Sequence, residues 1–230
     1  METRNSAKRK RKTTDRQEAS PGKRRSSDAK RKIILRAARK VFSRHPYHAA
    51  SMRMIAKEAH LDHPLIIYYF PTKAVLFETV MKDLTEEFSS EIPGWFKEIN
   101  EMSLFEGVST YLDRAIAFHR KNPEITRIMV LNMAQAVHKP NLIPGYQYIQ
   151  RVIDLGTDQF KERSPFKMNA QQTNYFIKGM SLLIINLMGA REYHAEIQGL
   201  DPASDAYFKW AKEVITFMIL PVLNSLELKE

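Results

Sequence analysis

The apolar positions of this chain follow a helical period from residue 28 onward. Between residues 28 and 42 they fall on one helical face: Ile33, Ile34, Ala37, Ala38, Val41 and Phe42. The polar residues at 26–28 are candidate N-caps, and Pro46 is expected to end the helix shortly after Ser43. The pattern predicts a helix over 28–43.

Two shorter helices are expected next. The first begins at the N-cap Ser51 and runs to about His60, and the second begins at His63 or Pro64 and stops before Pro71. Two short helices joined by about three residues form a helix-turn-helix. The inner face of the second helix is expected to hold Ile66, Tyr69 and Phe70. Its outer face is expected to hold His63, Pro64, Ile67 and Tyr68.

The rest of the chain is expected to be helical as well. Helices are predicted at 72–90, 103–122, 124–138, 146–163, 169–195 and 203–228, with a break or kink at Pro93–Gly94. No segment alternates with the period of a strand. The predicted fold class is therefore all-α.

Positive charge is concentrated at the start of the chain. Residues 1–32 hold 13 of the 36 lysines and arginines but 4 of the 26 acidic residues, so the remainder is nearly neutral. Residues 1–27 are expected to be a disordered basic tail, because they have too few apolar side chains to form a core. Such a tail suits nucleic acid phosphates. A solubilising tail, a nuclear-import signal and an anionic-membrane signal are the alternatives.

The composition and the missing motifs exclude several classes of protein. Without cysteine there are no disulfides, thiol nucleophiles or cysteine-bound metals. The apolar runs are shorter than the roughly 18 residues that span a bilayer, and no apolar segment follows the basic N-terminus. The sequence also lacks a P-loop and the G-x-G-x-x-G and G-x-S-x-G motifs. We expect a soluble cytoplasmic protein with no membrane partner, catalytic residue, metal or cofactor; an enzyme is the least favoured alternative.

Three motifs follow one another between residues 38 and 76. They are A-x-x-x-F at 38–42, I-A-x-x-A at 55–59 and Y-F-x-x-K-x-x-L at 69–76. In this order and spacing they resemble the DNA-binding domain of the TetR (tetracycline-repressor-like) family. The resemblance implies an all-α homodimeric transcription factor, usually a repressor. Residues 28–75 would form a three-helix DNA-binding domain with the helix-turn-helix, and residues 76–230 a larger helical domain for ligand binding and dimerisation.

The resemblance also implies roles for single residues. Ser51 and Arg53 match family positions that contact the DNA backbone, and Thr72 and Lys73 match the start of a helix whose N-terminus binds phosphate. Simple capping is the alternative for the two hydroxyl residues, and a solvated face is the alternative for the two cations. The residues expected on the base-reading helix are His63, Pro64, Leu65, Ile67 and Tyr68.

The sequence departs from the family pattern at four positions. Pro46 and His60 replace glycines, and a left-handed residue 60 would cost about 1 kcal/mol without a glycine. Either the turn differs or the strain is tolerated. Ile67 replaces a tyrosine that often contacts phosphate, and Leu65 stands where a threonine is common, so the base-reading face is unusually apolar.

The last two predicted helices are apolar around most of their circumference. Two copies of this pair could bury the surplus apolar faces in a four-helix interface, with Ile215 and Met218 inside it. A thick monomeric core is the alternative. We expect a homodimer.

A small-molecule site is expected between the helices of 103–195. Methionine and aromatic side chains are adaptable lining material there, and polar residues lie beside them. A plain core is again the alternative. The candidate ligand-binding residues are Tyr111, Arg114, Phe118, His119, Met129, Asn132, Met133, Phe160, Tyr175 and Met180.

The function favoured by these patterns is ligand-responsive transcriptional regulation. The partners would be a pseudo-palindromic double-stranded DNA operator and a small-molecule effector that is largely apolar with one or two polar groups. A non-specific binder of nucleic acid or anionic surfaces, driven by the basic tail, is the alternative from another class.

Overall fold

The computed structural model describes residues 21–133, 135 and 143–226, and every regular element in these ranges is a helix. The elements are α1 (Pro21–Phe42), α2 (Met52–Ala59), α3 (His63–Tyr69), α4 (Lys73–Trp95), the short 3-10 helix η1 (Ile99–Glu101), α5 (Leu104–Lys121), α6 (Pro123–Met133), α7 (Tyr146–Arg163), α8 (Ala170–Gly189), α9 (Arg191–Gln198) and α10 (Asp205–Asn224). The predicted all-α fold is confirmed. None of these helices is long and apolar enough to cross a membrane. Residues 1–20 of the expected tail lie outside the described residues.

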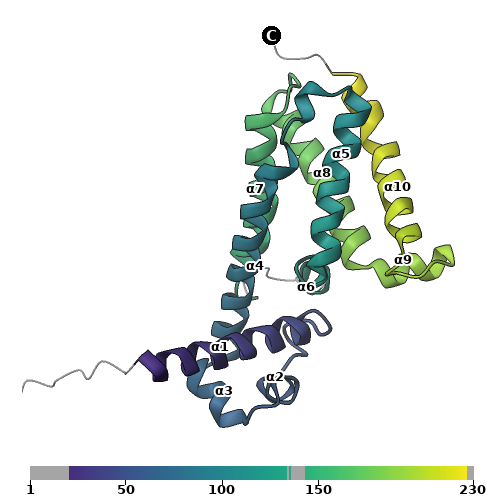
Figure 1. The fold of residues 1–230 in the computed structure, drawn as a ribbon. Coiled ribbons are helices and arrows are strands. Elements are labelled where there is room, and N and C mark those ends of the chain that lie inside the picture. The colour runs from purple at the N-terminus through teal and green to yellow at the C-terminus, as the bar shows by residue number, and fades with distance from the viewer. Residues whose placement is uncertain (1–20, 134, 136–142, 227–230) are drawn as a thin grey trace, which may run out of the picture.

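The helices form a small N-terminal unit and a larger bundle. Figure 1 shows α1, α2 and α3 together at one end, while α5, α7, α8 and α10 stand side by side above them. Helix α4 starts beside α3 and rises into the bundle (Figure 1). This helix therefore belongs to both parts.

The core of the small unit continues into α4. Phe42, Ile55 and Ile66 come from α1, α2 and α3 and are fully buried. Phe42 also packs edge to face on Phe77 of α4, with 4.8 Å between ring centroids. The small unit is thus attached to α4 through its own core.

Helix α1 begins earlier than the sequence predicted. It starts at Pro21 and runs through residues 26–28, so the predicted N-caps at these positions are wrong. Proline suits a first turn, because its missing N–H would have no helical partner there. The lysines and arginines that follow are good helix formers.

The turn between α2 and α3 keeps the left-handed conformation despite its non-glycine residue. His60 has φ 52° and ψ 42°, and its N–H donates to the carbonyl groups of Ala56 and Lys57. The strain is therefore tolerated, at a cost of about 1 kcal/mol. At the other end of α2, Ser51 is the N-cap as predicted, and α3 begins at His63 as predicted.

Four helices of the bundle end elsewhere than predicted. Helix α6 ends at Met133 and α10 ends at Asn224. Helix α4 continues through Pro93 to Trp95, so the chain has no break there. A proline in the last turn removes one backbone hydrogen bond, while Ile92 and Trp95 hold that turn in the core. The single helix predicted over 169–195 is two helices, α8 and α9, which meet at Ala190.

Gly189, the last residue of α8, lies close against α6. A Cβ at this position would lie 2.5 Å from the carbonyl oxygen of Thr126 and 2.7 Å from Cγ2 of Val130. Both distances are shorter than van der Waals contact, so a glycine lets α8 approach α6 this closely. The chain turns into α9 directly after this contact.

We predict that Gly189→Ala lowers the free energy of unfolding by about 1 to 3 kcal/mol, because the added methyl group must push α6 and α8 apart. Urea denaturation at one fixed protein concentration measures the change. Gly94→Ala is the matched control, since a Cβ there meets nothing within 4 Å. Equal stability of the two variants would contradict the role given to Gly189.

Candidate nucleic-acid interface and candidate ligand cavity

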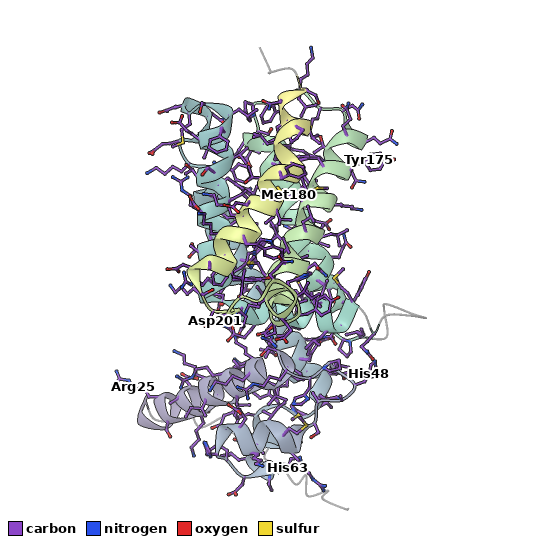
Figure 2. The ribbon with its side chains drawn as sticks, turned by 90° about the vertical axis from the view of Figure 1, so that its right-hand side faces the viewer. Arg25, His48, His63, Tyr175, Met180 and Asp201 are labelled. Atoms are coloured by element: carbon purple, nitrogen blue, oxygen red, sulfur yellow. The ribbon has the colours of Figure 1, made fainter. Side chains whose placement is uncertain are left out.

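Helix α3 has one exposed face at the end of the molecule away from the bundle. Tyr68 is 78% exposed and Ile67 is 37% exposed, and Pro64 is exposed as well. His63 and Leu65 are partly buried. Figure 2 shows His63 at the end opposite the bundle. Of the five residues predicted to read bases, Pro64, Ile67 and Tyr68 are thus the most accessible.

The N-termini of α2 and α4 are capped by the two predicted hydroxyl residues. Oγ of Ser51 accepts a hydrogen bond from the Met54 N–H, and Oγ1 of Thr72 accepts one from the Val75 N–H, each over 3.2 Å. Capping, the alternative for both residues, is therefore present. The free N–H groups of a first turn still favour an anion. Arg53 is exposed in the first turn of α2.

Lys73 has partners inside the protein that the sequence did not predict. Its Nζ donates to the carbonyl oxygens of Tyr47 at 2.7 Å and Ala50 at 2.9 Å, and it lies 4.4 Å from the Tyr47 ring centroid. Burial lowers the pKa of this ammonium group. Lys73 thus holds the segment between α1 and α2 in place, and two of its three N–H bonds are not available to phosphate.

The same segment is tied to the bundle by Asn132 on α6. Asn132 is fully buried, and its Oδ1 accepts a hydrogen bond from the Tyr47 N–H at 2.8 Å. Its Nδ2 donates to the Ile128 carbonyl oxygen at 2.7 Å. Both ends of the side chain are therefore engaged, so Asn132 belongs to the junction between the two parts rather than to a ligand site.

Two arginines strengthen this junction. Nε of Arg127 on α6 donates to the Ser43 carbonyl oxygen at 3.2 Å, and its guanidinium group also pairs with Glu192 of α9. On the other side of α1, Arg39 binds both carboxylate oxygens of Glu87 on α4. Bidentate arginine pairs add geometric specificity to such contacts.

The bundle encloses an apolar cavity of about 330 Å³ at the end distant from α3. Helices α5, α7, α8 and α10 and the η1 segment contribute its walls. Representative lining residues are Phe96, Tyr111, Phe160, Phe176, Met180 and Leu223. Pockets of roughly 300 to 1,000 Å³ with this composition are typical of small-molecule sites. We call this space the outer cavity.

A smaller inner cavity of about 40 Å³ lies next to the outer one, and Phe96, Tyr111 and Met180 line both. The inner cavity is also lined by Trp95, His119 and Met129. Figure 2 shows Met180 within the bundle. The two spaces are therefore neighbours that share part of their walls.

His119 is one of the polar residues that line the inner cavity. It is 5% exposed, and its Nδ1 has no hydrogen-bond partner within the described residues. Burial lowers the pKa of His119 to about 4, so the ring is neutral near pH 7. Burial also raises the pKa of Tyr111. The site thus holds uncharged polar groups in an apolar surrounding.

Five of the ten predicted ligand-binding residues line these cavities: Tyr111, His119, Met129, Phe160 and Met180. The other five lie elsewhere. Arg114 donates to the carbonyl oxygens at the end of α4, Phe118 packs on Phe88 and Trp95, and Asn132 lies at the junction. Met133 and Tyr175 are exposed on the surface.

Most of the lining was missed by the sequence patterns. Phe96, Phe176 and Leu223 line the outer cavity, but nothing distinguishes them from core residues in the sequence. Helical periodicity predicts that an apolar side chain faces inward. It does not predict whether the space in front of that side chain is filled.

Helices α8 and α10 pack on each other and each leaves apolar side chains exposed. Phe217 is 80% exposed and Met218 is 54% exposed on α10, while Tyr175 and Leu182 are exposed on α8. Ile215, predicted to lie in a dimer interface, is instead fully buried in the core of one protomer. Ile215 lies on the same face of α10 as Ala211 and Ile219, and this face packs inward.

Comparisons with known proteins agree with this geometry. The family model described as "Bacterial regulatory proteins, tetR family" matches residues 34–80, which run from α1 into α4. The chain is 26% identical to the HTH-type transcriptional regulator RutR of Escherichia coli K12, over 49% of this chain and 52% of that protein. It is 22% identical to the HTH-type transcriptional regulator BetI of Vibrio parahaemolyticus, over 66% of this chain and 74% of that protein. The match thus spans about half the length of RutR.

A solved structure shares the fold over most of the chain. The TetR transcriptional regulator from Legionella pneumophila superposes with a TM-score of 0.59 at 14% identity, and covers 81% of this chain and 95% of that one. The fold similarity therefore extends from the helix-turn-helix through the bundle. Residues 34–80 thus match the tetR family of bacterial regulatory proteins, and the chain as a whole shares the fold of a TetR transcriptional regulator.

Proposed function

We propose that this protein is a ligand-responsive transcriptional repressor. It binds a pseudo-palindromic operator as a homodimer, and a small, largely apolar molecule releases it. Residues 28–75 contact the DNA, and residues 76–230 hold the effector and the second protomer. The exposed face of α3 within a helix-turn-helix is the observation that carries this proposal.

The side chains on α3 suit the major groove. The Tyr68 hydroxyl can donate or accept a hydrogen bond at a base edge, and Ile67 offers an apolar contact to a thymine methyl group. The N-termini of α2 and α4 supply N–H groups for the flanking phosphates. The side chains for base contacts and the helix N-termini for phosphate contacts thus lie in one small unit.

The exposed apolar side chains of α8 and α10 support a homodimer. Phe217, Met218 and Leu182 are large apolar residues on neighbouring helices, and water contact with such a surface is unfavourable. The same face on a second copy would cover them, as an interface with twofold symmetry requires. The monomeric alternative leaves these side chains in water.

Helix α6 can transmit the effector signal. Thr126 and Met129 line the inner cavity, while Arg127 and Asn132 on the same helix bind the segment after α1. Helix α4 offers a second route, since Trp95 lies at the cavity and Phe77 lies at α1. A ligand shifts the DNA-binding equilibrium by its preference for one arrangement of these helices.

Selection of bound fragments from genomic DNA, followed by footprinting, tests the proposal as a whole. A regulator protects discrete pseudo-palindromic sites with half-sites about one helical turn or a multiple apart. Diffuse protection without sequence preference would instead support the non-specific binder driven by the basic tail.

We predict that Tyr68→Ala weakens binding to the selected operator by about 1 to 3 kcal/mol and leaves binding to random DNA nearly unchanged, because it removes a base contact. Titrations on both DNAs at one salt concentration measure this difference. Tyr193→Ala is the control, because it removes another exposed tyrosine, from α9. It should change binding to neither DNA. An equal loss on both DNAs would rule out base reading by Tyr68.

We predict that Phe217→Asp dissociates the dimer at micromolar concentration, because it would bury an unpaired charge at a cost of about 3 kcal/mol or more. Sedimentation velocity measures the oligomeric state. Phe105→Asp is the control, since Phe105 is exposed on α5, outside this face. A dimer that tolerates both Phe217→Asp and Leu182→Asp would move the interface elsewhere.

We predict that Asn132→Ala and Met180→Trp separate effector binding from its transmission. Asn132→Ala leaves the Tyr47 N–H without its partner and should weaken the effect of a bound molecule on operator affinity while the molecule still binds. Met180→Trp fills the space shared by both cavities and should abolish binding itself. For binders found in a small-molecule screen, calorimetry and operator titrations measure the two steps. A full effector response in Asn132→Ala would exclude the α6 route.

A further inference from the structure

The walls of both cavities lack charged side chains. Within the described residues, neither the outer nor the inner cavity is lined by any Asp, Glu, Lys or Arg. The polar residues Asn100 and Asn224 are exposed and lie where the outer cavity meets solvent. An ion bound deep in this site would therefore have no counter-ion in the walls, and burying an unpaired ion costs several kcal/mol.

One histidine in the wall of the inner cavity has a buried nitrogen without a hydrogen-bond partner in the described residues. His119 stands among aromatic rings, with centroids 5.2 Å from Phe118, 6.1 Å from Phe88 and 6.1 Å from Trp95. Its Nδ1 has no partner within the described part of the chain. A buried polar atom without a partner is costly, so a bound group that completes this hydrogen bond gains affinity.

We propose that the effector is an uncharged molecule with one hydrogen-bonding group, which it places on the imidazole ring of His119 while its apolar body fills the outer cavity. This assignment rests on the proposed function, in which this site takes the effector. It narrows that function, because it excludes carboxylates, phosphates and amines and selects alcohols, phenols or amides with a large apolar part.

The neutral state of His119 agrees with this ligand class. Burial disfavours the imidazolium form, so the neutral ring can offer an anionic ligand a hydrogen bond but no counter-ion. A hydroxyl group needs no counter-ion, and it can donate to or accept from a neutral imidazole nitrogen. The hydrogen bond then forms with either tautomer.

Trp95 provides a direct reporter of binding. It lines the inner cavity, and the chain has 2 tryptophans, so Trp210→Phe leaves Trp95 as the sole source of tryptophan fluorescence. In this full-length background we would titrate 1-nonanol, 1-chlorononane and nonanoate, which share one chain length. A second series uses 4-phenylbutan-1-ol with its chloride and carboxylate.

We expect the alcohol of at least one series to bind about 2- to 12-fold more tightly than its chloride, the range for one hydrogen bond, and its carboxylate to bind at least about 10-fold more weakly than the alcohol. His119→Phe should remove the preference for the alcohol and keep chloride binding. His194→Phe, which makes the same change on α9 outside both cavities, should keep that preference. Melting curves establish that each variant is folded.

Three results would overturn the assignment. They are no binding of either alcohol below about 1 mM, tighter binding of a carboxylate, or an alcohol preference that survives in both His119→Phe and His119→Leu. The proposed function is tested separately by operator titrations with the same molecules. A carboxylate that binds and releases the operator would refute the uncharged effector and support effector release.

Discussion

A buried hydrogen bond from the Tyr47 N–H to Asn132 fixes the DNA-binding helices relative to the bundle. The Tyr47 carbonyl oxygen is held by Lys73, and its ring packs on Phe77 with 5.0 Å between centroids. One residue after α1 is thus bound by α6 and by α4. A buried amide that loses its partner costs about 1 to 3 kcal/mol. The small unit therefore cannot shift on the bundle without breaking contacts at this residue.

The free energy of this hydrogen bond is as large as the coupling free energy that effector release needs. Coupling between two sites is typically about 1 to 3 kcal/mol, which changes affinity about 5- to 150-fold. Loss of a single buried hydrogen bond covers the same range. Helix α6 has 11 residues, and it lines the inner cavity with Met129 and reaches Tyr47 with Asn132. In the proposed mechanism a small displacement of this helix is therefore sufficient to lower the affinity for the operator.

The sequence predicted the parts of the structure that depend on local chemistry. Helical periodicity located α2, α3, α5, α7 and most of α1, and Ser51 and Thr72 cap their helices as their hydroxyl groups suggested. The prediction failed where the structure depends on a contact between segments that are far apart in the sequence. The close approach of α8 to α6 at Gly189 and Thr126 is a contact that no local pattern shows.

The candidate sites divide in the same way. Exposure of Tyr68 followed from the face it occupies on α3, because the opposite face had to pack inward. For polar residues inside the bundle, the pattern could not distinguish a cavity from a neighbouring backbone. Asn132 and Arg114 look like ligand residues in the sequence, yet each binds backbone groups of another segment. Only the three-dimensional path of the chain supplies those partners.

Helix α5 shows how the fold keeps the cavity free of charge. Its Tyr111 and His119 face the cavities, while the charged residues between them have partners elsewhere. Arg114 donates to three carbonyl groups in the last turn of α4 and just after it, at distances down to 2.6 Å. Asp113 is paired with Lys212 of α10 at 2.6 Å. Because the structural charges are used outside the cavity, selectivity within it depends on shape and on the hydrogen-bonding capacity of a neutral histidine.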